Sequence, residues 1–456
     1  MSIISKVLGA IEKDLLRPIS KDILGTDNGI RSTNQLGPGD IEITNLTIMR
    51  EDGQRAMTLI SHCKTMEIYE SVLSPVIFAE LNIADAAGIR QELPINGEEY
   101  VRIVMRTPDT KIPVTYLLRV FEVTDEKVTR NGQMRTYTLK CCSPELFRSA
   151  KTHISNNYHG TVSEAVTQIL DNALGSEKPF VVEDTKGVKE RILSRLTPFA
   201  AIDYLRRNAI SKTHKSSSFV FFENRDGFKF CTLERLMHEG SLLGITDKRF
   251  FFDTASNNTD INNVTMRNII AFNQVQSSSS LSMIARGGIS NVAKQFDLFT
   301  GDVTVYNYTD NESADEFKTI DKKGASQRTA THAMEHGQVA TKAGLSASTV
   351  AAVPTNSESG ESGTAAMMAV RRAYTQKLVD NIVQIYVYGD TDVTVGDVIH
   401  CSFPKAVGTT EDSKTTRFDS GNYLVTKVRH MIVLGDRPGH TMSLELIKGS
   451  ILDDGS

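Results

Sequence analysis

The motif that most suggests catalysis is His332-Ala333-Met334-Glu335-His336. They match the H-x-x-E-H pattern of inverted zinc peptidases, in which two histidines four residues apart share one face of a helix. The flanking segments, SQRTAT and GQVATKAG, lack the apolar stripe that would seat such a helix in a core. We therefore expect a solvated segment, and we keep a zinc hydrolase using His332, Glu335 and His336 as the alternative of another class.

A second stretch, VGDVIHCSFP from Val395 to Pro404, places a histidine beside a cysteine. A catalytic cysteine needs its base within hydrogen-bonding distance. The run has the pattern of an alternating strand, and neighbouring residues of a strand point to opposite faces. We expect His400 and Cys401 to face apart, with Cys401 packed as a small hydrophobe.

A third stretch, Gly389–Asp392, has the acidic spacing of a calcium loop. An EF-hand loop beginning at Asp390 would need Asn or Asp at its fifth position, Gly at its sixth and Glu at its twelfth. The sequence has Thr394, Val395 and Cys401 there, so we predict a turn between strands. Phosphate-binding, nucleophile-elbow and dinucleotide motifs are missing from the sequence as well. We predict no enzymatic activity, no catalytic or metal-binding residues and no cofactor.

Composition narrows the class of protein further. The 456 residues are 40% hydrophobic and carry a net charge of −4, which argues against a protein that grips nucleic acid through a basic face. Five widely spaced cysteines without a C-x-x-C motif indicate a reducing compartment rather than a disulfide framework. No apolar run approaches the roughly 18 residues of a membrane span, so we expect no membrane insertion.

The elements that must position these residues are mostly strands. We predict an N-terminal amphipathic helix and arm over 1–40, which packs on its own chain or docks on a partner. Strand runs over 41–148 predict a first β-domain. A helical period in 149–245 predicts an α+β insert. The helix signals of this insert are a capping box at Thr161 and Glu164, a terminating Gly175, and a cap at Thr197 before Pro198.

Strand patterns return in 246–310 and again in 381–456, and we assign both segments to a second β-domain. The interrupting segment, 311–380, contains a Ser-, Thr-, Ala- and Gly-rich stretch at 341–364 that predicts a flexible linker, followed by a helix. The long loop 404–420 is either a contact for a partner or a solvated hairpin tip.

Two segments share one order of elements. The first runs from Gly97 through a strand, through YLLRVFEV from Tyr116, and through a turn at Asn131-Gly132 to a closing strand. The second runs from Gly396 through a strand, through YLVTKVRHMIV from Tyr423, and through a turn near 435–439 to a closing strand. We infer that the chain carries two copies of one β-domain.

The same strand runs resemble a known family. IYESVLSPVIFAELNIADAAG, LPINGEEYVRI and TYLLRVFEVTD resemble the N-terminal domain of baseplate central hub proteins of contractile-tailed bacteriophages. PFAAIDYLRRNAIS, SFVFFENRDGFKFCTLERL, VYGDTDVTVGDVIHCSFP and SGNYLVTKV are similar to later parts of that family. The resemblance covers most of 41–240 and 366–450, and residues 310–365 carry no matching motif.

The resemblance implies a mainly β fold with two tail-tube-like β-barrel or sandwich domains per chain plus a smaller α+β domain. It implies a homotrimer that joins a sixfold tail tube to a threefold central spike and leaves a channel for DNA. The implied partners are the spike protein, a tube or tube-initiator protein, and the tape measure and wedge proteins, with DNA only in transit. The implied location is the virion baseplate, after assembly in the bacterial cytoplasm. The alternative is the hub of a phage-derived injection system, of the bacteriocin or type VI kind.

Metal content separates the structural interpretation from the hydrolase alternative. We expect purified protein to hold well under one zinc per chain, because His332 and His336 lack a core to fix their geometry. Elemental analysis after dialysis measures this, with a His332→Ala/His336→Ala variant as the control. Stoichiometric, tightly held zinc that disappears in the double variant would revive the hydrolase.

Overall fold

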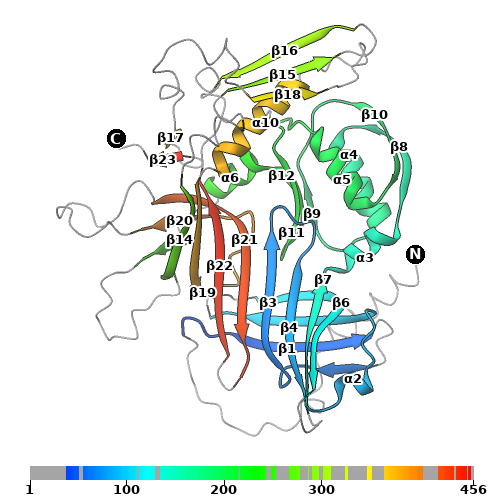
Figure 1. The fold of residues 1–456 in the computed structure, drawn as a ribbon, viewed down its shortest axis with the longest axis vertical. Coiled ribbons are helices and arrows are strands. Elements are labelled where there is room, and N and C mark those ends of the chain that lie inside the picture. The colour runs from blue at the N-terminus through cyan, green and yellow to red at the C-terminus, as the bar shows by residue number, and fades with distance from the viewer. Residues whose placement is uncertain are drawn as a thin grey trace, which may run out of the picture. The chain divides into compact units, whose positions relative to one another are not determined.

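The fold is described from a computed structural model (Figure 1). The structure describes residues 37–50, 55–108, 110, 112–128, 134–214, 216–242, 248–252, 267–277, 286, 290–296, 301–309, 324–326, 347–351, 364–379, 381–403, 420–435, 438–448 and 450–452. The predicted N-terminal helix, the turn at Asn131-Gly132, the His332–His336 motif and the loop 404–419 lie outside these residues. The chain divides into two compact units: residues 1–67, 79–142 and 432–440 form unit 1, and residues 68–78, 143–431 and 441–456 form unit 2.

The first β-domain is an antiparallel meander with added edge strands. Its elements are β1 (Glu42–Arg50), β2 (Ala56–Thr58), β3 (Cys63–Ser71), β4 (Phe78–Asp85), α2 (Ile89–Glu92), β5 (Glu99–Arg106), β6 (Val114–Val128) and β7 (Arg135–Cys142). The strand order is β3-β4-β7-β6-β5-β1-β2. Alternate residues of β5 are buried, which is the signature of a strand with one face on a core.

The second β-domain is assembled from two separated parts of the chain. Its strands are β13 (Arg249–Phe251), β14 (Ile269–Ser277), β19 (Asn381–Tyr388), β20 (Val398–Ser402), β21 (Gly421–Val433) and β22 (Gly439–Ile447). They lie in the order β14-β19-β22-β21-β20-β13. Strand β14 pairs antiparallel with β19 although more than a hundred residues separate them, so the sheet closes across the interruption that the sequence predicts.

The two β-domains share one topology. Strands β1, β3, β4, β5, β6 and β7 of the first correspond, in chain order and in sheet order, to β13, β14, β19, β20, β21 and β22 of the second. One pairing differs, since β1 runs antiparallel to β5 whereas the three-residue β13 runs parallel to β20. The internal repeat and the mainly β fold class predicted from the sequence are therefore confirmed at the level of topology.

The insert forms helices and strands as its sequence signals predict. Its elements are α3 (Pro144–Lys151), β8 (Ile154–Gly160), α4 (Val162–Gln168), the π-helix η1 (Ile169–Leu174), β9 (Phe180–Val182), β10 (Lys189–Leu196), α5 (Pro198–Arg207), β11 (Phe219–Asn224), β12 (Gly227–Thr232) and α6 (Leu233–Leu242). Thr161 and Glu164 form a complete capping box, and Gly175 ends η1 in the left-handed conformation. Thr197 caps α5, which begins at Pro198.

Strand β11 joins two hydrophobic cores. All six of its residues are buried. Phe219 and Phe221 belong to the core of the insert, together with α4 and α5. Val220 and Phe222 point the other way and belong to the core of the second β-domain, together with Val395. Since successive strand residues face opposite sides, one six-residue strand ties the insert to the second repeat through both of its faces.

The interrupting segment contains strands as well as the predicted helix. It contains β17 (Gly324–Ser326), β18 (Ala347–Ala351) and the predicted helix, α10 (Thr364–Val379), and β17 pairs with β23 (Ser450–Leu452). The strands just before it are β15 (Ser290–Phe296) and β16 (Val303–Thr309). Strands β15 and β16, which we had assigned to the second β-domain, instead form a small sheet with β18.

Strand β18 lies inside the predicted linker 341–364 and pairs parallel with β15, so that prediction is wrong for these five residues. Ala293 of β15 packs on Ala369 and Ala373 of α10. Small side chains permit this close approach between the strand and the helix. Among the described helices, none is long and apolar enough to cross a membrane.

Candidate functional site

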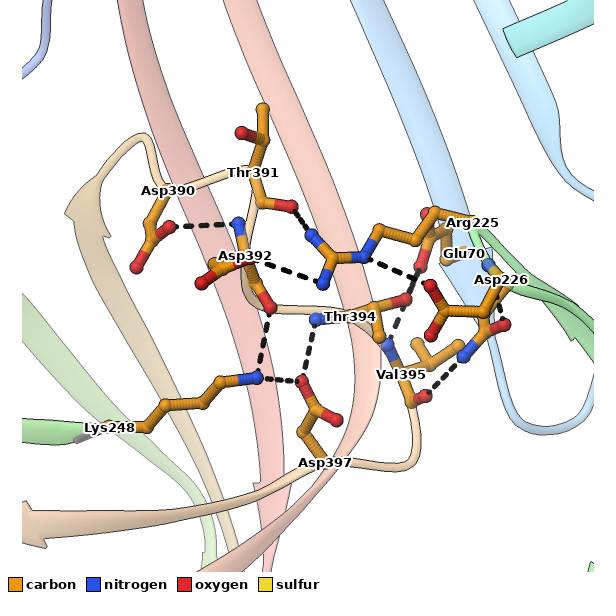
Figure 2. Close-up of polar contacts among 11 residues, drawn as sticks. Glu70, Arg225, Asp226, Lys248, Asp390, Thr391, Asp392, Thr394, Val395 and Asp397 are labelled. Atoms are coloured by element: carbon orange, nitrogen blue, oxygen red, sulfur yellow. Dashed lines mark hydrogen bonds and ion pairs between the residues drawn. The ribbon is translucent and has the colours of Figure 1, made fainter. Parts of the chain in front are cut away.

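A densely bonded polar site surrounds the loop that joins β19 to β20, Gly389–Asp397 (Figure 2). The loop carries three aspartates and two threonines, yet every residue except Asp392 and Asp397 is buried. Burial of polar groups is tolerated only where each finds a hydrogen-bond partner. Four segments of unit 2 supply those partners, and we call this arrangement the loop clamp.

The hairpin between β11 and β12 holds the clamp from the side of the insert. The Arg225 guanidinium donates to the Thr391 carbonyl and to Asp392 Oδ1, the latter at 3.3 Å. Asn224 Nδ2 donates to the Val395 carbonyl at 3.4 Å. The neighbouring Asp226 also lies 3.4 Å from Arg225 Nε, so the charge of the cation is matched on two sides. These contacts lock the hairpin tip onto the loop.

Two further side chains hold the loop from segments remote in sequence. Glu70, only 2% exposed, accepts from Thr394 Oγ1 at 2.6 Å and from the Val395 amide at 3.4 Å. Lys248 Nζ donates to the Asp392 carbonyl at 2.9 Å and to Asp397 Oδ2 at 2.7 Å. The same Asp397 carboxylate accepts from the Thr394 amide at 3.1 Å, which closes the loop on itself.

Asp390 forms the turn within the clamp. Its Oδ1 accepts from the Asp392 amide at 2.8 Å, and its Oδ2 lies 3.6 Å from Arg267 Nη2. The carboxyl group is fully buried, and this burial raises the pKa of Asp390 above its ordinary value. The predicted turn at Gly389–Asp392 is confirmed, and the aspartate spacing that resembles a calcium loop serves an Asx-type turn instead.

Gly396 is the point of closest approach between the loop and the insert. Its φ of 88° lies in the left-handed region that favours glycine. A Cβ atom there would lie 3.0 Å from Phe222 Cζ and 3.4 Å from Leu236 Cδ2. The bare backbone therefore lets the aromatic ring of the insert lie directly over the loop.

The corresponding loop of the first repeat has the same internal design without the cover. Gly97 also has a positive φ, 95°, and the buried Glu99 carboxylate accepts from the Asn96 and Gly97 amides. The nearest atom to a Cβ on Gly97 would be the Val120 carbonyl oxygen at 3.7 Å. Residues 86, 87, 91, 92, 94, 96 and 98 of this loop are exposed, so the repeats differ in whether their loops are covered.

The charged side chains of the clamp contact one another and the loop backbone. Its cations are held by carboxylates or carbonyl oxygens, and within the part of the chain that the structure describes no group of three His, Cys, Asp or Glu residues could hold a metal ion. His400 contacts Asn422 through Nδ1 at 2.9 Å, whereas Cys401 is fully buried, and burial raises the pKa of its thiol. The prediction that the two face apart is confirmed. His332, Glu335 and His336 lie outside the described residues.

Sequence reasoning missed Glu70, Arg225 and Lys248 as functional residues. The pair Asp226-Gly227 is typical of a turn between strands, and in the structure it connects β11 to β12. That signal places Arg225 on a hairpin tip but says nothing of what it touches. Glu70 and Lys248 had no local signal, because both act on a loop remote in sequence.

Comparison with solved structures supports the fold. No protein-family model and no curated protein matches the sequence. A tail protein from Neisseria meningitidis MC58 matches at 11% identity, covering 90% of this chain and 97% of that chain, with a TM-score of 0.51. A 43 kDa tail protein of prophage MuSo2 from Shewanella oneidensis matches at 9% identity, covering 90% and 99%, with a TM-score of 0.53. At this identity the similarity shows that the chain has the fold of phage tail proteins.

Adding one methyl group at Gly396 tests whether the insert lies on the loop. We expect Gly396→Ala to destabilise unit 2 by about 2 kcal/mol or more, because φ is strained and the methyl meets Phe222. Gly97→Ala is the matched control, with the same strain and no covering ring, and should cost about 1 kcal/mol. Urea unfolding followed by circular dichroism measures both, since the chain has no tryptophan. Equal effects would contradict the close packing.

Removing the Arg225 guanidinium tests the clamp itself. Arg225→Met keeps most of the apolar stem but leaves the buried Thr391 carbonyl without its donor, so we expect a loss of about 2 kcal/mol. Arg207→Met, which removes an exposed ion pair with Asp203 in the same unit, should change stability by less than about 1 kcal/mol. Hydrogen exchange of the loop 389–397 should rise in the first variant alone. Unchanged exchange there would mean that Arg225 does not hold the loop.

Proposed function

We propose that this protein is the structural hub of a contractile phage tail, a homotrimer that joins a sixfold tail tube to a threefold central spike. It acts through shape and assembly rather than through catalysis. The observation that carries this proposal is the pair of β-domains with one strand topology in a single chain. Three chains supply six such domains, which is the number that a sixfold tube presents.

The loop clamp gives the same six domains a threefold character. In the second repeat the loop 389–397 is buried under Phe222 and Arg225 of the insert, whereas the matching loop of the first repeat is exposed. A ring of alternating repeats would therefore carry an insert on every second domain. The β-sheets of such a ring follow sixfold symmetry and its insert domains follow threefold symmetry, as an adaptor between the two symmetries requires.

The proposed partners follow from the two symmetries. The side of the ring formed by the β-domains contacts the tail tube or a tube-initiator protein. The side that carries the inserts contacts the spike protein. Tape measure and wedge proteins are further contacts, and the protein is located in the virion baseplate after assembly in the bacterial cytoplasm. Obligate contacts of this kind bury on the order of 2,000 Å² or more.

The charge of the chain suits a channel for DNA. A net charge of −4 gives no reason for a polyanion to be retained during passage. A strongly basic lumen would bind phosphates and slow release, so a slightly acidic chain favours transit over storage. DNA is accordingly a passing cargo in this proposal and not a ligand.

Electron microscopy of the purified protein, alone and with its spike protein, tests the proposal. We expect threefold rings with an open central channel, and a native mass of three chains. Chains that remain monomeric at high concentration and in the presence of the spike protein would overturn the hub assignment. A twofold assembly would do the same, because two chains carry only four β-domains.

A further inference from the structure

Three arginines meet where helix α5 of the insert ends beside helix α10. Arg206 and Arg207 lie in the last turn of α5, and Arg371 of α10 donates from Nη1 to the Arg207 carbonyl at 2.9 Å. Helix α10 is held in place one turn earlier, where Ser217 Oγ donates to the Met367 carbonyl at 2.9 Å. Two helices of unit 2 thereby gather three guanidinium groups, and we call Arg206, Arg207 and Arg371 the arginine cluster.

One carboxylate, that of Asp203, serves the arginine cluster. Its Oδ1 accepts from Arg206 Nε at 3.1 Å, and its Oδ2 accepts from Arg207 Nη2. Within the described residues Arg371 has no carboxylate partner. Burial, and after it the positive charges of Arg206 and Arg207, lower the pKa of the Arg371 guanidinium below its ordinary value. Charges that are partly removed from water are normally paired, so the cluster is short of negative charge.

The end of helix α5 attracts cations by itself, because the last carbonyls of a helix carry partial negative charge. This attraction explains Arg206 and Arg207 in the last turn, and it explains the bond of Arg371 to a terminal carbonyl. It does not explain why a third guanidinium is placed against two others. A guanidinium has five N–H donors, and one hydrogen bond joins Arg371 to the described part of the chain. The remaining donors are left to water or to an anion.

A largely apolar pocket of about 190 Å³ adjoins the arginine cluster through Arg206. Asp203 and Arg206 are its charged lining residues, and the rest of its lining is apolar: Val72, Leu73, Pro75, Phe199, Val220 and Phe221. Leu73 is 76% exposed although its neighbours in this lining are not. A dry cavity of about 150 Å³ holds one benzene ring, so this pocket has room for a single apolar side chain beside the guanidinium groups.

We propose that the arginine cluster and this pocket form a docking site for an acidic segment of a partner protein. Carboxylates of the segment pair with Arg207 and Arg371, and an apolar side chain next to them enters the pocket. Charge selects the partner, because the site has three cations and one carboxylate in a chain whose net charge is −4, and guanidinium forks match carboxylates. The backbone of DNA would satisfy the arginines but offers nothing apolar to the pocket. The site lies within one chain, so this inference does not rest on the proposed trimer.

Peptide binding to the purified full chain tests the site. The probes are acetylated glutamate octapeptides that carry one phenylalanine at successive positions, and isothermal titration calorimetry measures their dissociation constants at low and high salt. We expect at least one of them to bind, and we expect salt to weaken the binding because the arginines are partly exposed to solvent. An octapeptide of glutamate alone should bind about tenfold more weakly, because it leaves the pocket empty.

Two substitutions with matched controls locate the binding. Arg371→Gln should weaken the tightest peptide about tenfold, because it removes a charge-assisted pair. Arg148→Gln should leave binding unchanged, although the Arg148 guanidinium also donates to a single backbone carbonyl, that of Gly175. Leu73→Asp should weaken binding about tenfold or more by placing a carboxylate at the pocket. Ile192→Asp, at an equally exposed position (77%), should have no effect. Circular dichroism and the melting temperature verify that all four variants fold.

Each control changes the net charge by the same amount as the variant it accompanies. Equal losses in variants and controls would therefore mean that overall charge alone governs binding, and the site would be refuted. Failure of every phenylalanine-containing peptide to bind would refute it as well. A duplex DNA that binds more tightly than every peptide, and loses its affinity in Arg371→Gln, would reveal a phosphate site in place of a protein-docking site. The native mass of the same samples tests the hub proposal separately.

Discussion

The burial of a polar loop beneath a hydrophobic strand is the constraint on which unit 2 depends. Residues 389–397 can lie in the interior only because Arg225, Glu70 and Lys248 satisfy their carbonyl, hydroxyl and amide groups. Arg225 in turn comes into range because it directly follows β11, all six residues of which are buried. Hydrogen bonding and apolar packing are thus mutually dependent here. Loss of the packing would expose the loop to solvent, and loss of the hydrogen bonds would leave its buried polar groups without partners.

This dependence makes two β-domains of equal topology unequal in their surroundings. The first repeat has the glycine turn at Gly97, and the Glu99 carboxylate accepts a hydrogen bond from the Gly97 amide. No insert covers this turn. The second keeps the same turn at Gly396 and places Phe222 on it. A repeated sheet with an unrepeated cover therefore distinguishes the two β-domains of one chain.

Of the three stretches that suggested chemistry, the two that the structure describes have structural roles. Cys401 lies in a core and His400 contacts Asn422 across the sheet, so strand alternation alone was enough to separate them. Asp390 and Asp392 suggested a cation, and the cations present are the side chains of Arg267, Arg225 and Lys248. Paired charges of opposite sign in a buried loop are therefore a poor guide to metal binding unless the contacts from remote segments are known.

The sequence by itself determined the local events. Capping at Thr161 and Thr197, the hairpin at Asp226-Gly227 and the strand carrying Cys401 depend on neighbours a few residues away, so their signals are local. The internal repeat could also be inferred from the sequence, because the two copies have their strands and turns in the same order. Only the tertiary structure decided that Lys248 and Glu70 reach partners 149 and 324 positions further along the chain, and that β18 finds β15. Contacts between segments remote in sequence depend on how all intervening elements pack, and no local pattern records that.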